Sequence, residues 1–141
     1  MTTRHGSARY EGFGKTGKGH VSTESGVLAD TPYSFNTRFG DERGTNPEEL
    51  IAAAHASCFT MALSFALAGA GYSEGTLETS AAVKLEQDGA GFKVTHSDLT
   101  LTASVPGIDA EQFASIAADA KANCPISKVL NAEISLTHTL S

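Results

Sequence analysis

The chain has 141 residues, of which 40% are hydrophobic and 18% charged, and its formal net charge at pH 7 is -6. A domain of this length buries about two thirds of its unfolded surface around one core, so we expect a single compact domain. The acidic balance, with no run of Lys or Arg, argues against a nucleic-acid partner or an anionic membrane surface, because both favour basic residues that displace counterions.

The N-terminal residues lack the apolar stretch of a secretory signal, so we expect a cytoplasmic protein. In that reducing compartment the two cysteines favour redox chemistry over a permanent structural disulfide. Neither a CxxC motif nor a paired Cys/His ligand spacing occurs, so we expect no structural zinc site.

The first part of the chain is predicted to form strands separated by turns. Residues 8–13 alternate loosely, the glycines of residues 14–19 mark a turn, and residues 20–25 carry β-branched side chains that suit a hairpin partner. Residues 33–39 alternate aromatic with polar side chains, which predicts another strand. Arg38 is expected on or near the end of that strand.

A long helix is predicted from about residue 46 to residue 68. Asn46 can cap it, and Pro47 suits the first helical position, where a missing N–H costs nothing. Glu48 and Glu49 lie where the positive end of the helix dipole favours anions.

The same helix raises the question of a membrane span, because residues 50–70 contain no charged side chain. Many of these residues are alanine, and polar side chains interrupt them, so transfer into a bilayer is only weakly favoured. We therefore predict a soluble helix that is buried on nearly every side. A single small chain could leave part of such a helix uncovered, and a homodimer with a shared core would cover it.

Two strands and a turn follow this helix. Alternate residues from Leu77 to Leu85 share one face, residues 88–91 form a turn, and Phe92 begins a return strand. Beyond His96 the apolar positions change parity, which predicts a β-bulge near residues 96–98.

The last part of the chain predicts a second helix and a final strand. Asp109 can cap a helix that ends near Ala122, and Cys124 with Pro125 opens a short helical turn. Residues 134–140 alternate as a strand. The order of strands, helix, hairpin, helix and strand indicates an α+β fold with mostly antiparallel sheets.

The two cysteines stand in settings that suit an attacking and a resolving thiol, although free cysteines are also common as small core residues. Cys58 lies about 16 Å from the start of the long helix, so the helix dipole does not reach it. Burial by itself would raise the pKa of this thiol. A reactive Cys58 therefore needs a cation from another part of the fold.

Arg38 is the candidate for that cation. Its guanidinium stays charged and can donate to a thiolate and to an oxygen at once, and Glu48 could hold it in a bidentate pair. An ordinary surface salt bridge is the alternative. Because thiolate formation alone gives a modest acceleration, stabilisation of a leaving oxyanion must contribute, which favours a peroxide as substrate.

His55 lies one helical turn before Cys58, so a Cys/His nucleophilic pair must be weighed. We expect His55 instead to be a packing or pocket-polarity residue, because hydrolase pairs usually come from separate elements. Cys124 could condense with a Cys58 sulfenic acid to form a disulfide. Its position before Pro125 places its sulfur near the free N–H groups of a helical turn, which can lower a thiol pKa.

Four short stretches match a known family. They are Thr37-Arg38-Phe39, the run from Gly44 through Asn46, Pro47 and Glu48 to Cys58 and Phe59, Val105-Pro106-Gly107-Ile108, and Asn123-Cys124-Pro125-Ile126-Ser127. Together they resemble the OsmC branch of the OsmC/Ohr family, with a likeness that runs from about Gly17 to Leu140. The most specific part is the Asn-Pro-Glu entry into a helix that carries a cysteine.

The resemblance implies a single OsmC-like domain over residues 1–141 and an intertwined homodimer with mostly antiparallel sheets around long central helices. It implies a cysteine-based organic hydroperoxide reductase in which Cys58 is the peroxidatic cysteine and Cys124 the resolving one. Arg38 would be the activating cation and Glu48 its partner, with Glu49 as a weaker alternative. Family members use no metal or organic cofactor and are recycled by an external dithiol, often of lipoyl type.

Apolar residues near Cys58 predict a preference for alkyl or aryl peroxides over hydrogen peroxide. The expected lining is Phe59, Met61 and Phe65 with Tyr33 or Phe35. Two other functions remain open from the residues themselves. One is a small hydrophobic-ligand binding protein with structural cysteines, and the other is a cysteine hydrolase that uses Cys58 and His55.

Overall fold

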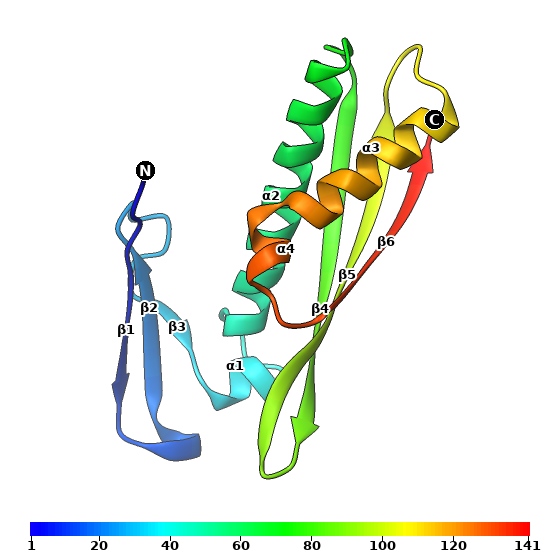
Figure 1. Cartoon of the computed structure of the whole chain (residues 1–141). Helices are drawn as coiled ribbons and strands as arrows, with labels where there is room; N and C mark the ends of the chain where they lie inside the picture. Colours follow the sequence, from blue (N-terminus) through cyan, green and yellow to red (C-terminus); the bar gives the residue numbers. More distant parts are fainter. The chain divides into compact units, whose positions relative to one another are not determined.

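The computed structural model describes residues 1–141. The chain divides into two compact units, Met1–Leu50 and Ile51–Ser141, which are described separately. The first unit contains a three-stranded antiparallel sheet of β1 (Gly6–Glu11), β2 (Lys18–Thr23) and β3 (Thr31–Tyr33), in that order (Figure 1). The short 3-10 helix η1 (Gly14–Thr16) lies in the turn between β1 and β2, so the predicted hairpin is confirmed.

The predicted strand over residues 33–39 is wrong, because most of this segment is the helix α1 (Phe35–Phe39). Ser34 and Thr37 form a capping box, in which the Ser34 hydroxyl accepts from the Thr37 N–H at 3.2 Å and the Thr37 hydroxyl accepts from the Ser34 N–H at 2.7 Å. Phe35 and Phe39 are four residues apart and their ring centroids lie 5.0 Å from one another. Arg38 is therefore in the last turn of a short helix.

The long helix is confirmed as α2 (Pro47–Gly69), which begins in the first unit and continues in the second. Asn46 caps it as predicted, since its Oδ1 accepts the N–H of Glu49 at 2.9 Å. By length and composition alone, α2 could cross a membrane. Its buried side chains nevertheless form part of the core of the second unit.

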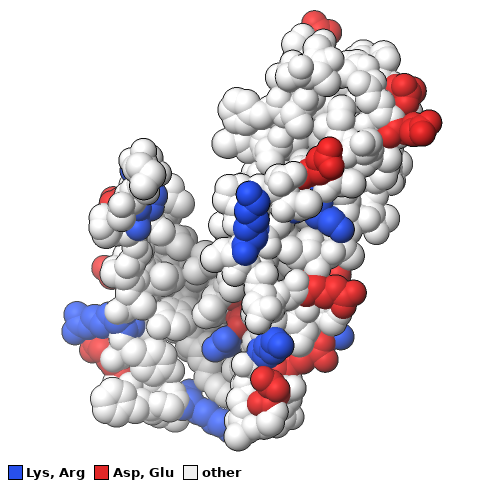
Figure 2. All heavy atoms as spheres, viewed as in Figure 1, with Lys and Arg blue, Asp and Glu red and all other residues white.

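The second unit is a three-stranded sheet of β4 (Thr76–Asp88), β5 (Gly91–Ser104) and β6 (Glu133–Leu140). β4 and β5 are antiparallel, whereas β6 pairs with β5 in parallel after a crossover through α3 (Ala110–Asn123) and α4 (Pro125–Val129). Asp109 caps α3 as predicted, by accepting the Gln112 N–H at 2.8 Å. On the face shown in Figure 2, acidic and basic side chains are interspersed over this unit.

The core of the second unit lies between one face of the sheet and the helices α2 and α3. Phe59 and Leu63 of α2, Leu99 and Leu101 of β5 and Phe113 of α3 are almost fully buried in it. The register of β4 against β5 shifts where Lys84 pairs with His96 and Leu85 with Val94. The bulge is therefore at Thr95, just before the predicted position. After the bulge, the odd-numbered residues of β5 face the core.

The expectation that α2 is buried on nearly every side is wrong for the chain alone. Its buried residues are one stripe with a spacing of four, namely His55, Phe59, Leu63 and Leu67. Met61 and Phe65 are 63% and 71% exposed. Within the second unit, the sheet and α3 cover only one side of α2, so its other apolar faces stay uncovered there.

Candidate active site

The structure brings together the two cysteines that the sequence singles out. Cys58 is half-buried on α2, and Cys124 is fully buried between α3 and α4. Both are free thiols, and they lie close enough for each to change the pKa of the other. Two thiols in contact can be joined by a disulfide without a large rearrangement of the chain.

The two thiols differ in acidity. Burial raises the pKa of Cys58, the Ile126 N–H lowers it in part, and the neighbouring Cys124 raises it again, so that the pKa stays above its ordinary value. Burial also opposes ionisation of Cys124, but the Ser127 N–H, the Cys58 thiol, the Ser127 hydroxyl and the Ile126 N–H together lower the pKa of Cys124. The acidifying effect expected of the turn after Cys124 is therefore present.

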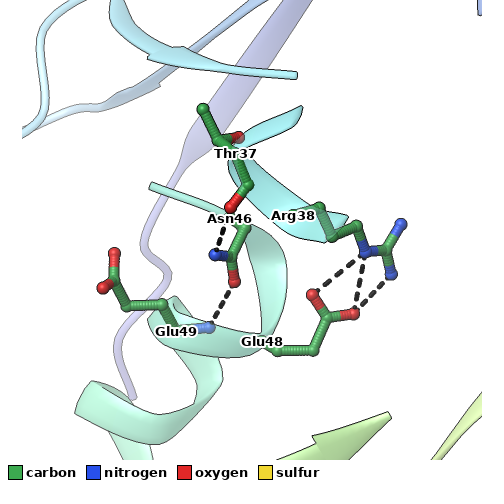
Figure 3. Close-up of polar contacts among 5 residues, drawn as sticks. All are labelled: Thr37, Arg38, Asn46, Glu48 and Glu49. Carbon is green, nitrogen blue, oxygen red and sulfur yellow. Dashed lines mark hydrogen bonds and ion pairs between the residues drawn. The ribbon is translucent and has the colours of Figure 1, made fainter. Parts of the chain in front are cut away.

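The first unit contains the predicted pair of Arg38 and Glu48. Arg38 donates from Nε to both carboxylate oxygens of Glu48 at 3.0 Å and also from Nη2 to Oε1 (Figure 3). The side chain of Glu48 is 12% exposed and that of Arg38 is 37% exposed. The carboxylate thus fixes one edge of a guanidinium that keeps part of its surface accessible.

Glu49 makes different contacts, so the choice between the two glutamates is clear from the geometry. Its side chain accepts from the Thr45 hydroxyl at 2.8 Å, and its N–H donates to Asn46. In Figure 3 its carboxylate points away from Arg38. Glu48 is the ion-pair partner.

An aromatic groove of about 360 Å³ adjoins Arg38 within the first unit. Its lining includes Tyr10, Tyr33, Phe35, Phe39 and Arg38. The Arg38 guanidinium lies 5.5 Å from the Phe39 ring centroid, and the Lys15 ammonium lies 5.1 Å from that of Phe35. The groove therefore has apolar walls and a guanidinium at the same site.

The expected lining from α2 differs from the structure. Phe59 is fully buried in the core of the second unit, beside Leu63, and lines no groove. Met61 lines an open groove of about 580 Å³ together with Ser57, Thr60 and Thr79. Sequence spacing identified these residues as apolar but could not show which of them the core would take up.

His55 is fully buried and has both ring nitrogens occupied. Nδ1 lies 2.6 Å from the Ser97 hydroxyl and Nε2 lies 2.8 Å from the Ser127 hydroxyl. Burial lowers the pKa of His55, which keeps the imidazole neutral at pH 7. These contacts support the expectation of a packing or polarity residue and leave no nitrogen for a Cys58–His55 pair.

Ser97 and Ser127 both contact His55, and neither was predicted from the sequence motifs. Ser127 follows Cys124 in the first turn of α4, and its N–H and hydroxyl both lower the pKa of the Cys124 thiol. Ser97 faces the core on β5, just after the bulge. The only signal for Ser97 was the change of parity beyond His96, which moves this position to the buried face.

A half-buried free thiol close to a fully buried one at a helix entrance, in an α+β fold, is an arrangement suited to cysteine redox chemistry. Comparison with known proteins agrees with this class. The model of the family described as "OsmC-like protein" matches residues 40–139. The chain belongs to the OsmC family, as its sequence motifs indicated.

Relatives cover almost the whole chain. It is 55% identical over 137 residues to "Peroxiredoxin OsmC" of Escherichia coli (strain K12), covering 97% of this chain and 96% of the relative. It is 31% identical to "Organic hydroperoxide resistance protein" of Xanthomonas axonopodis pv. citri (strain 306), covering 86% and 84%. The crystal structure of the organic hydroperoxide resistance protein OhrB of Bacillus subtilis has a TM-score of 0.73 at 30% identity and covers 98% of both chains.

Proposed function

We propose that this chain is a cysteine-based peroxidase that reduces organic hydroperoxides to alcohols and is recycled by a dithiol. The observation that carries the proposal is the close approach of two free thiols, Cys58 and Cys124, each of which changes the pKa of the other. The relatives, a peroxiredoxin and organic hydroperoxide resistance proteins, support the same activity. The proposal includes the cytoplasm as the location, where a dithiol reductant can act.

In the first step, the Cys58 thiolate attacks the terminal oxygen of the hydroperoxide. A sulfur–oxygen bond forms and the oxygen–oxygen bond breaks, so Cys58 is oxidised to a sulfenic acid and the peroxide leaves as an alkoxide that is protonated to the alcohol. In the second step, the Cys124 thiolate attacks the sulfenic sulfur. The disulfide forms, and the departing hydroxide is protonated to water.

In the third step an external dithiol reduces the Cys58–Cys124 disulfide and is itself oxidised to a disulfide. A lipoyl-type group is the proposed reductant. The cycle uses only the two protein thiols, the peroxide and this dithiol, so it requires no metal and no organic cofactor.

Arg38 is the proposed activating cation and Glu48 its partner. Within its own unit, Cys58 has a raised pKa, so a stable thiolate requires positive charge from outside that unit. A guanidinium held on one edge by Glu48 has donors left for a thiolate and for the leaving oxygen. The aromatic groove beside Arg38 suits an alkyl or aryl substituent, which hydrogen peroxide lacks.

The working form is proposed to be an intertwined homodimer in which residues 1–141 of each chain form one OsmC-like domain. Met61 and Phe65 expose apolar surface on a helix that also contributes to the core. Soluble monomers rarely expose such a face, so a second copy of the chain is the proposed cover.

Thiol titration tests this proposal directly. One equivalent of cumene hydroperoxide should remove both free thiols, and a dithiol should restore them. The Cys58→Ser variant should consume no peroxide, and hydrogen peroxide should be a much poorer substrate for the parent. If both thiols survive the organic peroxide, the chain is instead a hydrophobic-ligand binding protein with structural cysteines.

A further inference from the structure

His55 belongs to a buried line of polar contacts that ends at Cys124. Ser97 contacts His55 Nδ1 at 2.6 Å, and His55 Nε2 contacts the Ser127 hydroxyl at 2.8 Å. Ser127 lies in the first turn of the helix that Cys124 caps, and its hydroxyl acts on the Cys124 thiol in the direction expected of a hydrogen bond to the sulfur, by lowering its pKa. The line joins β5, α2 and α4, three elements that meet around one thiol.

The direction of the protons in this line follows from donor and acceptor counts. When Cys124 is a thiolate it can only accept, so the Ser127 O–H must point at the sulfur. The Ser127 oxygen is then free to accept from His55, which requires an N–H on Nε2. A neutral imidazole has a single N–H, so Nδ1 must accept from the Ser97 hydroxyl.

The surroundings of the line contain little that competes with this arrangement. The polar contacts of His55 are two serine hydroxyls, with no carboxylate or cation among them. Cys58 is a titratable neighbour of Cys124 within the second unit. One proton arrangement therefore satisfies every polar atom of the line.

We propose that His55 is a positioning residue for the resolving cysteine, because its Nε2–H holds the Ser127 hydroxyl with the proton directed at the Cys124 sulfur. This inference rests on the proposed function. As Cys124 attacks the Cys58 sulfenic acid, the sulfur–sulfur bond forms, the sulfur–oxygen bond breaks and hydroxide leaves, while the Ser127 proton stays on its oxygen. When the external dithiol reduces the disulfide, the same hydroxyl stabilises Cys124 if it departs as the thiolate.

The first test measures the ionisation of Cys124 and needs no peroxidase activity. In a Cys58→Ser background, where Cys124 is the sole cysteine, the ultraviolet absorbance of the thiolate is followed against pH. Ser127→Ala and His55→Ala should move the midpoint to higher pH. Ser127→Thr, which keeps the hydroxyl, and His55→Gln, which keeps an N–H donor near the Nε2 position, should move it back toward the parent value.

Ser135→Ala is the matched control, because it removes an exposed hydroxyl that hydrogen-bonds Asp98 on another part of the second unit. It should leave the midpoint unchanged. A folded Ser127→Ala protein, judged by circular dichroism, that titrates like the parent would overturn the proposal. The proposal would also be overturned if Cys124 had the same midpoint in His55→Gln as in His55→Ala. That result would mean that an N–H donor at position 55 does not affect the Cys124 thiolate.

The second test separates this inference from the proposed function. After one equivalent of cumene hydroperoxide, disulfide formation in Ser127→Ala should be slower by about tenfold, in line with the loss of a hydrogen bond to a charged group. Cys58 sulfenic acid should accumulate and be trapped by dimedone. If the parent chain forms neither sulfenic acid nor disulfide, the proposed function fails, while the thiolate titration still decides whether His55 and Ser127 act on Cys124.

Discussion

Asn46 donates its side-chain amide to the carbonyl oxygen of Thr37 at 3.0 Å while its Oδ1 accepts the N–H of Glu49 (Figure 3). Thr37 directly precedes Arg38, and Glu49 directly follows Glu48. One side chain thus ties the end of α1 to the first turn of α2 on either side of the ion pair. The Arg38–Glu48 geometry is therefore supported by a backbone connection as well as by charge.

Replacement of Asn46 should separate these two contributions. Asn46→Ala removes the cap and the tie, and we expect it to lower the free energy of unfolding by about 1 kcal/mol. Asn46→Asp keeps the capping oxygen but has no donor for Thr37, so it should be nearly as stable as the parent yet less active with organic peroxide. Urea denaturation and peroxide consumption measure the two effects. Equal activity in Asn46→Asp and the parent would argue that the tie has no role.

Glu48→Gln should reduce kcat/KM for cumene hydroperoxide by about 10-fold to 100-fold, because a misplaced catalytic group costs that much in rate. The uncharged amide holds the guanidinium less firmly. Glu49→Gln is the control, since the Glu49 carboxylate accepts from Thr45 and is not the ion-pair partner of Arg38. If both variants lose activity to the same extent, the specific role of Glu48 is wrong.

Arg38→Ala should impair peroxide reduction more severely than Glu48→Gln, because it removes the cation itself. Arg38→Lys keeps the charge but loses the planar set of donors, so we expect an intermediate activity. Steady-state kinetics with an organic peroxide rank the three variants. The mechanism would not survive an Arg38→Ala protein that keeps the parent rate.

The buried His55 should make stability depend on pH. Burial lowers the pKa of His55 from its ordinary value of 6.5, so in the window below 6.5 the unfolded chain binds a proton that the folded chain does not. The contribution of His55 is complete above pH 6.5 and is lost as the pH falls through that window. Urea denaturation of the parent and His55→Gln across this range should show the stability difference shrinking toward acid pH, whereas a constant difference would contradict it.

Cys124→Ser should make Cys58 vulnerable to its own substrate. Without a resolving thiol, the Cys58 sulfenic acid persists and excess peroxide oxidises it irreversibly to the sulfinic and sulfonic acids. Mass spectrometry of the peptide that contains Cys58 should show these species in the variant and a disulfide in the parent. Similar over-oxidation in both proteins would mean that Cys124 does not protect Cys58.

Much of the fold was predictable because its signals are local. Asn46 and Pro47 mark the start of α2, Asp109 marks the start of α3, and alternation defines β4 and most of β5. The strand prediction for residues 33–39 was wrong because it relied on the alternation of aromatic and polar side chains. The capping box of Ser34 and Thr37 is a competing local signal, and it favours a helix.

The parts of the site that were missed depend on contacts between residues far apart in the chain. His55 meets Ser97 and Ser127 across separations of 42 and 72 residues, and no spacing rule reaches that far. The ion pair of Arg38 with Glu48 was within reach because only ten residues separate them. The contact of Cys58 with Cys124 followed from the family resemblance and from the chemistry that two thiols allow.

The parallel pairing of β6 with β5 has a consequence for how the protein withstands peroxide. Cys124 lies in the crossover that this pairing requires, so its sulfur reaches Cys58 only when the crossover has closed over the sheet. If Cys124 resolves Cys58 as proposed, an incompletely folded chain would have Cys58 without a resolving thiol in reach. Such a chain would be over-oxidised by peroxide, whereas the folded protein would be recycled.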